Sequence, residues 1–160
     1  MRIRTIVTLA GSFALLACAE QEPPAPEPEA EAAAAPQPAA MPRTPSPQGA
    51  AVYLIAPGNG AQVTSPVRVA FGLKGAGVAP AGIDLPNTGH HHLLVDTGLA
   101  DAGLPVPADA QHIHFGLGQT ETTIELAAGE HSLQLILGDH LHIPHDPPLL
   151  SETVTVTVVE

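Results

Sequence analysis

The chain has 160 residues, a formal net charge of −11 at pH 7, nine histidines, no tryptophan and a single cysteine. One cysteine excludes an intrachain disulfide, so stability has to come from packing or from a bound metal ion. The acidic balance favours cations and argues against nucleic acids and anionic lipid surfaces, because both would repel it. We therefore expect no nucleic-acid partner.

The first 17 residues have the pattern of a lipoprotein signal peptide. Arg2 and Arg4 form a basic start, and residues 6–16 are apolar but too few to span a bilayer as an ordinary helix. The stretch ends in Leu-Leu-Ala-Cys at Cys18, which resembles a bacterial lipobox. The resemblance implies lipidation of Cys18 and anchoring in the outer membrane, facing the periplasm. The alternative is an ordinary cleaved secretory signal, and in either case we expect an exported domain.

Residues 18–49 consist mainly of Ala, Pro and Glu. Proline removes backbone donors and favours extended conformations, and the glutamates repel one another. We expect a disordered linker over 18–49, between the lipidated cysteine and a single histidine-rich domain formed by residues 50–160.

The domain has an all-β pattern. Short segments with alternating apolar residues are separated by Gly- and Pro-rich turns, and none has a helical period. In chain order, the expected strands are 52–55, 67–72, 91–96, 122–126, 132–137 and 154–158. The pattern predicts an immunoglobulin-like antiparallel β-sandwich with a core of Val, Leu and Ile. Three long connections are candidates for functional loops: 75–89, 97–110 and 138–151.

All nine histidines lie between His90 and His145. Most of them form three His-x-His pairs, which are His90 with His92, His112 with His114, and His140 with His142. Alternate residues of a strand share a face, so each pair can aim two imidazoles at one point. If Leu93 and Val95 point into the core, His91 does too, and His90 and His92 point away from it. His131, alone at the start of a strand, is explained more simply by a structural hydrogen bond.

The histidine pairs predict a metal site, because imidazole is the commonest protein ligand for zinc and copper. One pair supplies two ligands, so a site with three or four ligands requires two segments to meet. The predicted domain has no Cys or Met, which favours Cu(II) or Zn(II) over Cu(I). The candidate ligands are His90, His92, His112, His114, His140, His142 and His145. The carboxylates that could orient them, or act as a ligand, are Asp96, Asp139 and Asp146.

Four histidine-bearing segments carry a family resemblance: GHHHLLVD at 89–96, HIHFGLGQTE at 112–121, GEHSLQL at 129–135 and GDHLHIPH at 138–145. They look like an exported bacterial family, domain-of-unknown-function family four-three-nine-nine. The resemblance runs from about Asn87 to Val158. It implies a periplasmic or surface domain without an assigned activity, and it supports the view that the histidine segments belong together.

A second, local resemblance involves residues 112–116. They are similar to the His-x-His-x-Phe-Gly strand of copper/zinc superoxide dismutases. In this chain Phe115 follows the second histidine immediately, so the spacing differs by one residue, and the dismutase disulfide is impossible with one cysteine. We interpret the likeness as local convergence on strand-borne histidine pairs.

Three classes of function stay open. The first is a lipid-anchored module that binds Cu(II) or Zn(II) for metal buffering, storage or delivery. The second is a structural or interaction domain of the cell envelope, with an envelope protein as partner, whose histidines brace loops by hydrogen bonding. The third is a metal-dependent redox enzyme or hydrolase, for which Glu121 and Asp139 are candidate water-activating groups. The sequence contains no recognised catalytic motif, so no catalytic residue is assigned.

Overall fold

The structure is a computed structural model that describes residues 41–160. The predicted signal peptide 1–17, the lipidation of Cys18 and the linker as far as residue 40 lie outside the described residues. The strands are β1 (Ala51–Ala56), β2 (Ala61–Thr64), β3 (Val67–Lys74), β4 (Gly77–Val78), β5 (Thr88–Val95), β6 (His112–His114), β7 (Glu121–Ile124), β8 (Gly129–Gly138) and β9 (Val154–Val159). Over the described range there is no helix long and apolar enough to cross a membrane. The all-β prediction is confirmed.

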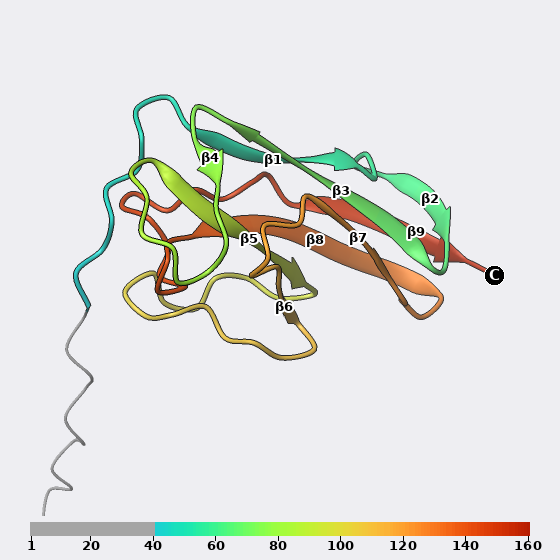
Figure 1. Cartoon of the computed structure of the whole chain (residues 1–160). Coiled ribbons are helices and arrows are strands. Elements are labelled where there is room, and N and C mark those ends of the chain that lie inside the picture. The colour runs from blue at the N-terminus through green and yellow to red at the C-terminus, as the bar shows by residue number, and fades with distance from the viewer. Residues whose placement is uncertain (1–40) are drawn as a thin grey trace, which may run out of the picture. The chain divides into compact units, whose positions relative to one another are not determined.

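The strands form two sheets (Figure 1). The smaller has the order β1-β3-β7 and is antiparallel. The larger has the order β2-β9-β8-β5-β4, and β6 pairs with β5 on the edge that β4 also uses. The pairings of β2 with β9 and of β4 with β5 are parallel, so the larger sheet is mixed and not purely antiparallel as predicted. The strands β2 and β4 have four and two residues, too few for alternation to indicate them.

One apolar core lies between the two sheets. Alternate residues of β8, namely Leu133, Leu135 and Leu137, are fully buried in it, as are Leu93 of β5 and Val69 of β3. Burying one such side chain contributes roughly 1.5–3 kcal/mol. The core is therefore the Val, Leu and Ile core that the alternation predicted, and it fixes which face of β5 points inward.

The opposite face of the larger sheet is covered by loops. Leu94 of β5 and Ile136 of β8 point away from the main core and form a second buried cluster with Val106, against which Leu99 packs. Both Leu99 and Val106 come from the long connection between β5 and β6, drawn in yellow tones on the side of β5 away from β1 and β3 (Figure 1). This face is consequently an interior, where polar side chains lose contact with water.

Residues 43–46, called the N-terminal strap below, belong to the folded unit. Pro45 pairs with Asp146 in an isolated parallel bridge, and the backbones of Thr44 and Ser46 each exchange a hydrogen bond with Asp146 at 2.9 and 2.8 Å. The ordered domain therefore begins before residue 50, and the end of the predicted disordered linker is docked. Composition alone misplaced this boundary, because docking depends on partners about a hundred residues away in the sequence.

Candidate metal centre

Three imidazoles project from neighbouring strands of the larger sheet. In the pairing of β5 with β6, His92 lies opposite His114, and in the pairing of β5 with β8, His90 lies opposite Gly138. Opposite residues of an antiparallel ladder project to the same face, so His90, His92 and His114 gather over one patch. Gly138 leaves room for them, because a Cβ there would stand 3.0 Å from His92 Nε2.

A fourth imidazole, His142, comes from the loop that follows β8. Its backbone has φ 69°, in the left-handed region that residues other than glycine rarely adopt. The His142 N–H donates to the carbonyl of Asp139 at 2.9 Å, and its own carbonyl accepts from the N–H of Val106 at 2.9 Å. The Asp139 carboxylate is buried and accepts hydrogen bonds from the N–H groups of Leu141 and Ile143 at 2.8 and 3.0 Å. The loop is thus closed around Asp139 and presents His142 to the sheet.

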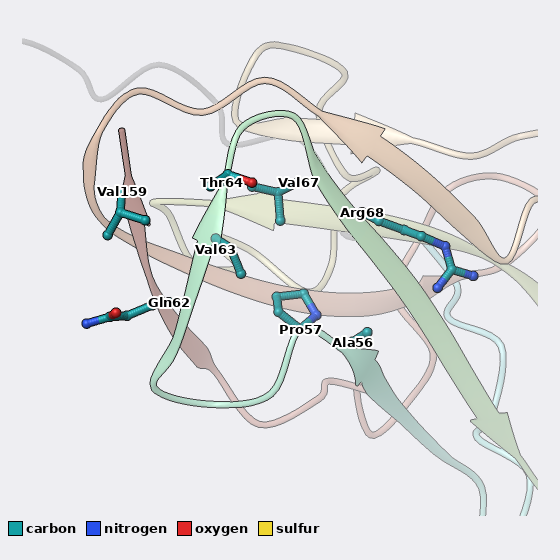
Figure 2. Close-up of a pocket in the computed structure, with 8 residues that line it drawn as sticks. All are labelled: Ala56, Pro57, Gln62, Val63, Thr64, Val67, Arg68 and Val159. Atoms are coloured by element: carbon teal, nitrogen blue, oxygen red, sulfur yellow. The ribbon is translucent and has the colours of Figure 1, made fainter.

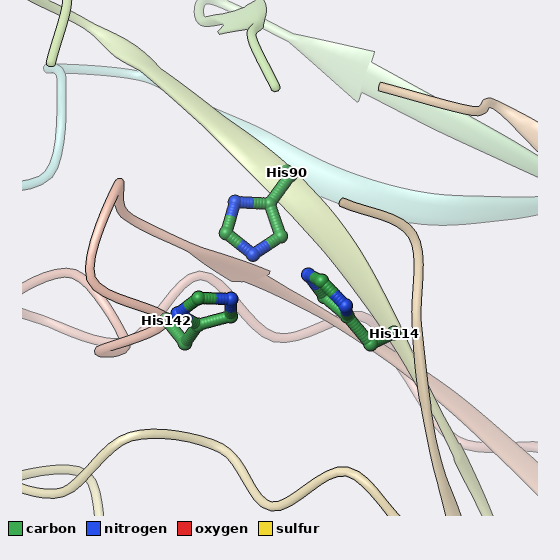
Figure 3. A group of neighbouring side chains, drawn as sticks. All are labelled: His90, His114 and His142. Carbon is green, nitrogen blue, oxygen red and sulfur yellow. The ribbon is translucent and has the colours of Figure 1, made fainter. Parts of the chain in front are cut away.

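The rings of His90, His92, His114 and His142, called the histidine cluster, contact one another. Ring centroids are 4.8–5.0 Å apart in all pairs except His92 with His142, where they are 5.9 Å apart. One nitrogen from each of His90, His114 and His142 lies within 4.8 Å of the other two, and these rings surround a common space (Figure 3). His92 Nε2 is 3.0 Å from His90 Nε2. Four ligands of one tetrahedral ion stand about 3.4 Å apart, so small ring movements would close the cluster on a metal.

Several nitrogens of the histidine cluster are buried without a hydrogen-bond partner. They are Nδ1 of His90, Nδ1 of His92 and Nε2 of His114. Burial, and after it the neighbouring imidazoles, lower the pKa of His90 to about 4 and that of His92 to about 3, and the same two causes lower the pKa of His114. The three rings are therefore neutral at pH 7, which is the form whose lone pair binds a metal ion.

The other members of two predicted pairs lie outside the cluster. His112 Nδ1 is 2.8 Å from a carboxylate oxygen of Asp109, three residues earlier in the chain. His140 Nδ1 is 3.6 Å from a carboxylate oxygen of Asp84. The pairs at 112–114 and 140–142 therefore each contribute one imidazole, whereas the pair on β5 contributes both.

Two fully buried histidines also stand apart from the cluster. His145, a predicted ligand, directs Nδ1 at the carbonyl of Leu137 at 3.3 Å, and its Nε2 has no partner. His91 points into the main core, as the alternation of β5 predicted, with its ring centroid 5.2 Å from that of Phe71. Burial lowers the pKa of His91 to about 4, so it is also neutral at pH 7.

The predicted orienting carboxylates bind other groups. Asp96 is 2.7 Å from His131 Nδ1, and this hydrogen bond raises the pKa of His131, the histidine to which the sequence assigned a structural role. Asp139 holds the backbone of its own loop, and Asp146 pairs with Arg43 at 3.0 Å. Among residues 41–160, no carboxylate makes a hydrogen bond or ion pair with a ring of the histidine cluster. The cluster consequently offers ring nitrogens to which no carboxylate is bound.

The smaller sheet holds the other candidate water-activating group. Glu121 of β7 pairs with Arg68 of β3 on the exposed surface and does not face the cluster.

A groove of about 450 Å³ is lined by Ala56, Pro57, Gln62, Val63, Thr64, Val67, Arg68 and Val159 (Figure 2). Neither a histidine nor a carboxylate lines this groove, so it supplies none of the groups that a metal-dependent hydrolase would use.

Two glycines that the His-x-His spacing does not indicate shape the site. A Cβ at Gly116 would stand 2.3 Å from Cε1 of His114, so the ring of His114 lies directly over Gly116. Gly138 leaves the corresponding space beside His92. Two sequence signals could have indicated these glycines. Gly116 follows the His112–His114 pair by two residues, and Gly138 ends the leucine-rich strand.

No curated protein and no solved structure gives a significant match to this chain. A family model does match over residues 69–159, which span β3 to β9 and include all nine histidines. The matched region is more than half of the chain, and it contains every ring of the histidine cluster. The chain therefore belongs to the family described as Domain of unknown function (DUF4399).

Proposed function

We propose that this domain binds one Cu(II) or Zn(II) ion between His90, His92, His114 and His142. The observation that carries the proposal is the convergence of four imidazoles from three chain segments, with buried ring nitrogens that have no other partner. An unpaired buried nitrogen costs on the order of 1–3 kcal/mol, and a bound ion would remove that cost.

The bracing alternative fits other histidines better than it fits the cluster. His112 and His131 each hold a carboxylate within 2.8 Å, and His131 also contacts the Ala127 carbonyl through Nε2 at 3.0 Å. In the cluster, His90 and His92 hydrogen-bond only to each other. Bracing therefore explains His112 and His131, whereas it does not explain why four imidazoles contact one another.

The donor set favours a borderline ion that accepts nitrogen ligands. Cu(II) and Zn(II) both bind imidazole at about 2 Å, whereas Mg(II) and Ca(II) prefer oxygen. Four imidazoles fill the tetrahedral shell of a Zn(II) ion and leave no position on that ion for a substrate. This completeness favours binding over catalysis, and we infer a role in metal buffering, storage or delivery.

The setting we propose is the cell envelope. The basic start, apolar stretch and lipobox-like Cys18 support export and lipid anchoring, with the domain facing the periplasm. An acidic chain would attract cations to its surface there. His114 and His142 are only partly buried, so an ion could reach the cluster from their side.

Metal binding is tested on the full chain, purified without a histidine tag. Elemental analysis should find one copper or zinc ion per chain, and either ion should raise the melting temperature while Mg(II) does not. The H90N/H142N double variant should bind no metal, and H112N should bind as the wild type does. Absence of bound metal together with absence of a thermal shift for the wild type would refute the proposal.

A further inference from the structure

The N-terminal strap is fastened to the loop that carries His142. The Thr44 hydroxyl donates to the Asp139 carboxylate at 2.8 Å, and the Ser46 hydroxyl donates to the Pro147 carbonyl at 2.5 Å. Arg43 donates from Nε to the Pro144 carbonyl at 3.1 Å. Its guanidinium also binds the carbonyl of His145 and the carboxylate of Asp146. The strap therefore binds the loop at two places, the Asp139 carboxylate and the segment from Pro144 to Pro147.

Asp139 joins these contacts to the histidine cluster. One of its carboxylate oxygens accepts from Leu141 and Ile143, the two neighbours of His142, and the other accepts from Thr44. A buried carboxylate that lacks one of its hydrogen-bond donors either destabilises the fold or turns toward another donor. Without Thr44, Asp139 is free to rotate, and the backbone that holds His142 at a positive φ loses part of its support.

We propose that the strap is a positioning element of the metal centre, with Thr44 and Arg43 acting on His142 through Asp139 and the backbone of its loop. This inference rests on the metal site proposed above. Coupling between two binding events is reciprocal, so if strap docking strengthens metal binding, metal must strengthen strap docking by the same factor. The predicted linker ends at the strap, so metal binding would stabilise the docked strap at the point where the linker meets the domain.

The first test removes the hydroxyl of Thr44. In the full chain, T44V should weaken Zn(II) affinity about tenfold in competition with a chromogenic chelator, the low end of effects reported for groups that orient metal ligands. T44S retains a hydroxyl and should restore the wild-type affinity. T64V makes the same change on exposed β2, away from the loop, and should leave the affinity unchanged. The Cu(II) absorption spectrum of T44V should also shift, which general destabilisation would not cause.

The second test uses the peptide bond after Arg43, which trypsin can cut only when the strap opens. Zn(II) should slow this cleavage about tenfold in the wild type and much less in T44V, while the bonds after Arg68 and Lys74 in β3 stay intact. If Zn(II) binds but T44V keeps full affinity and cleavage at Arg43 is unaffected by metal, the strap inference is overturned and the metal site stands. If the wild type binds no metal, both fall.

Discussion

His92 of β5 lies directly opposite His114 of β6, with their ring centroids 5.0 Å apart on the loop-covered face of the larger sheet. A pairing shifted by one residue would turn His114 toward the main core and separate the two rings. The register is fixed on the other face by Ile113, which packs against the main core beside Leu93. The apolar side of the sheet therefore determines the geometry of its histidine side.

The first prediction compares two histidines of the same short strand. H114N removes a ligand and should reduce Zn(II) or Cu(II) affinity by more than about 100-fold, beyond the effect of losing a group that only orients a ligand. H112N removes the partner of Asp109 and should leave the affinity unchanged. Isothermal titration of metal into both variants measures the affinities. Equal losses of affinity in H114N and H112N would show that His114 is no more a ligand than His112.

The second prediction separates affinity from stability at Gly116. In G116A the new Cβ would collide with the ring of His114, which can rotate aside because it is a side chain at a partly exposed position. Metal affinity should fall at least about tenfold, whereas the free energy of unfolding of the metal-free protein should change by less than about 1 kcal/mol. G98A, where a Cβ meets nothing within 4 Å, is the control and should change neither quantity. A G116A protein that binds metal normally would contradict the placement of His114.

Much of this arrangement follows from alternation along β5. The inward position of Leu93 and Val95 predicts that His91 is buried in the core and that His90 and His92 point to the other face, as observed. The two strands with leucine or valine at every second position, β8 and β9, were predicted for the same reason. Alternation is a local property, so sequence alone can determine it.

The convergence of the cluster depends on contacts that are distant in the sequence. His142 reaches the sheet because Asp139 and Val106 fix its loop, and neither interaction has a local pattern. Conversely, His112 lies outside the histidine cluster because its ring binds the Asp109 carboxylate. The spacing His-x-His therefore identified candidate ligands by residue type, but it could not predict which member of each pair meets the others.

The third prediction concerns Asp139 and Asp96, which were both predicted from the sequence as carboxylates that could orient the metal ligands. D139A leaves two backbone N–H groups and Thr44 without their buried acceptor and should cost about 3 kcal/mol of unfolding free energy, with metal affinity falling as well. D96A breaks the contacts with His131 and Ser132, remote from the cluster, and should reduce stability without changing metal affinity. Urea unfolding and metal titration of the two variants measure both quantities. Loss of metal affinity in D96A alone would contradict the assignment.

The fourth prediction is a pH dependence of the metal-free protein. Burial lowers the pKa of His91 to about 4 in the folded state, against 6.5 for the ordinary side chain. The unfolded chain therefore binds the proton first, so the stabilising contribution is complete above pH 6.5 and is lost as pH falls toward 4. The loss amounts to about 3 kcal/mol for this residue.

Denaturant unfolding with excess chelator between pH 8 and pH 4 measures this dependence. H91L has an apolar side chain of similar volume and should show a shallower loss than the wild type, being the more stable of the two at pH 5. His90 and His92 retain their lowered pKa values in both proteins, so the slope should decrease without vanishing. Identical pH profiles for the two proteins would show that His91 protonates as freely when folded as when unfolded.

The proposed metal centre is tested most directly by the position of a bound ion in crystals of the full chain grown with Zn(II), located by anomalous scattering at the zinc edge. We expect one strong peak between the rings, about 2.0–2.1 Å from a nitrogen of each of His90, His114 and His142, with His92 turned to complete the shell. A peak at the His112–Asp109 or His140–Asp84 contacts instead, or a histidine cluster without a peak at saturating zinc, would contradict it.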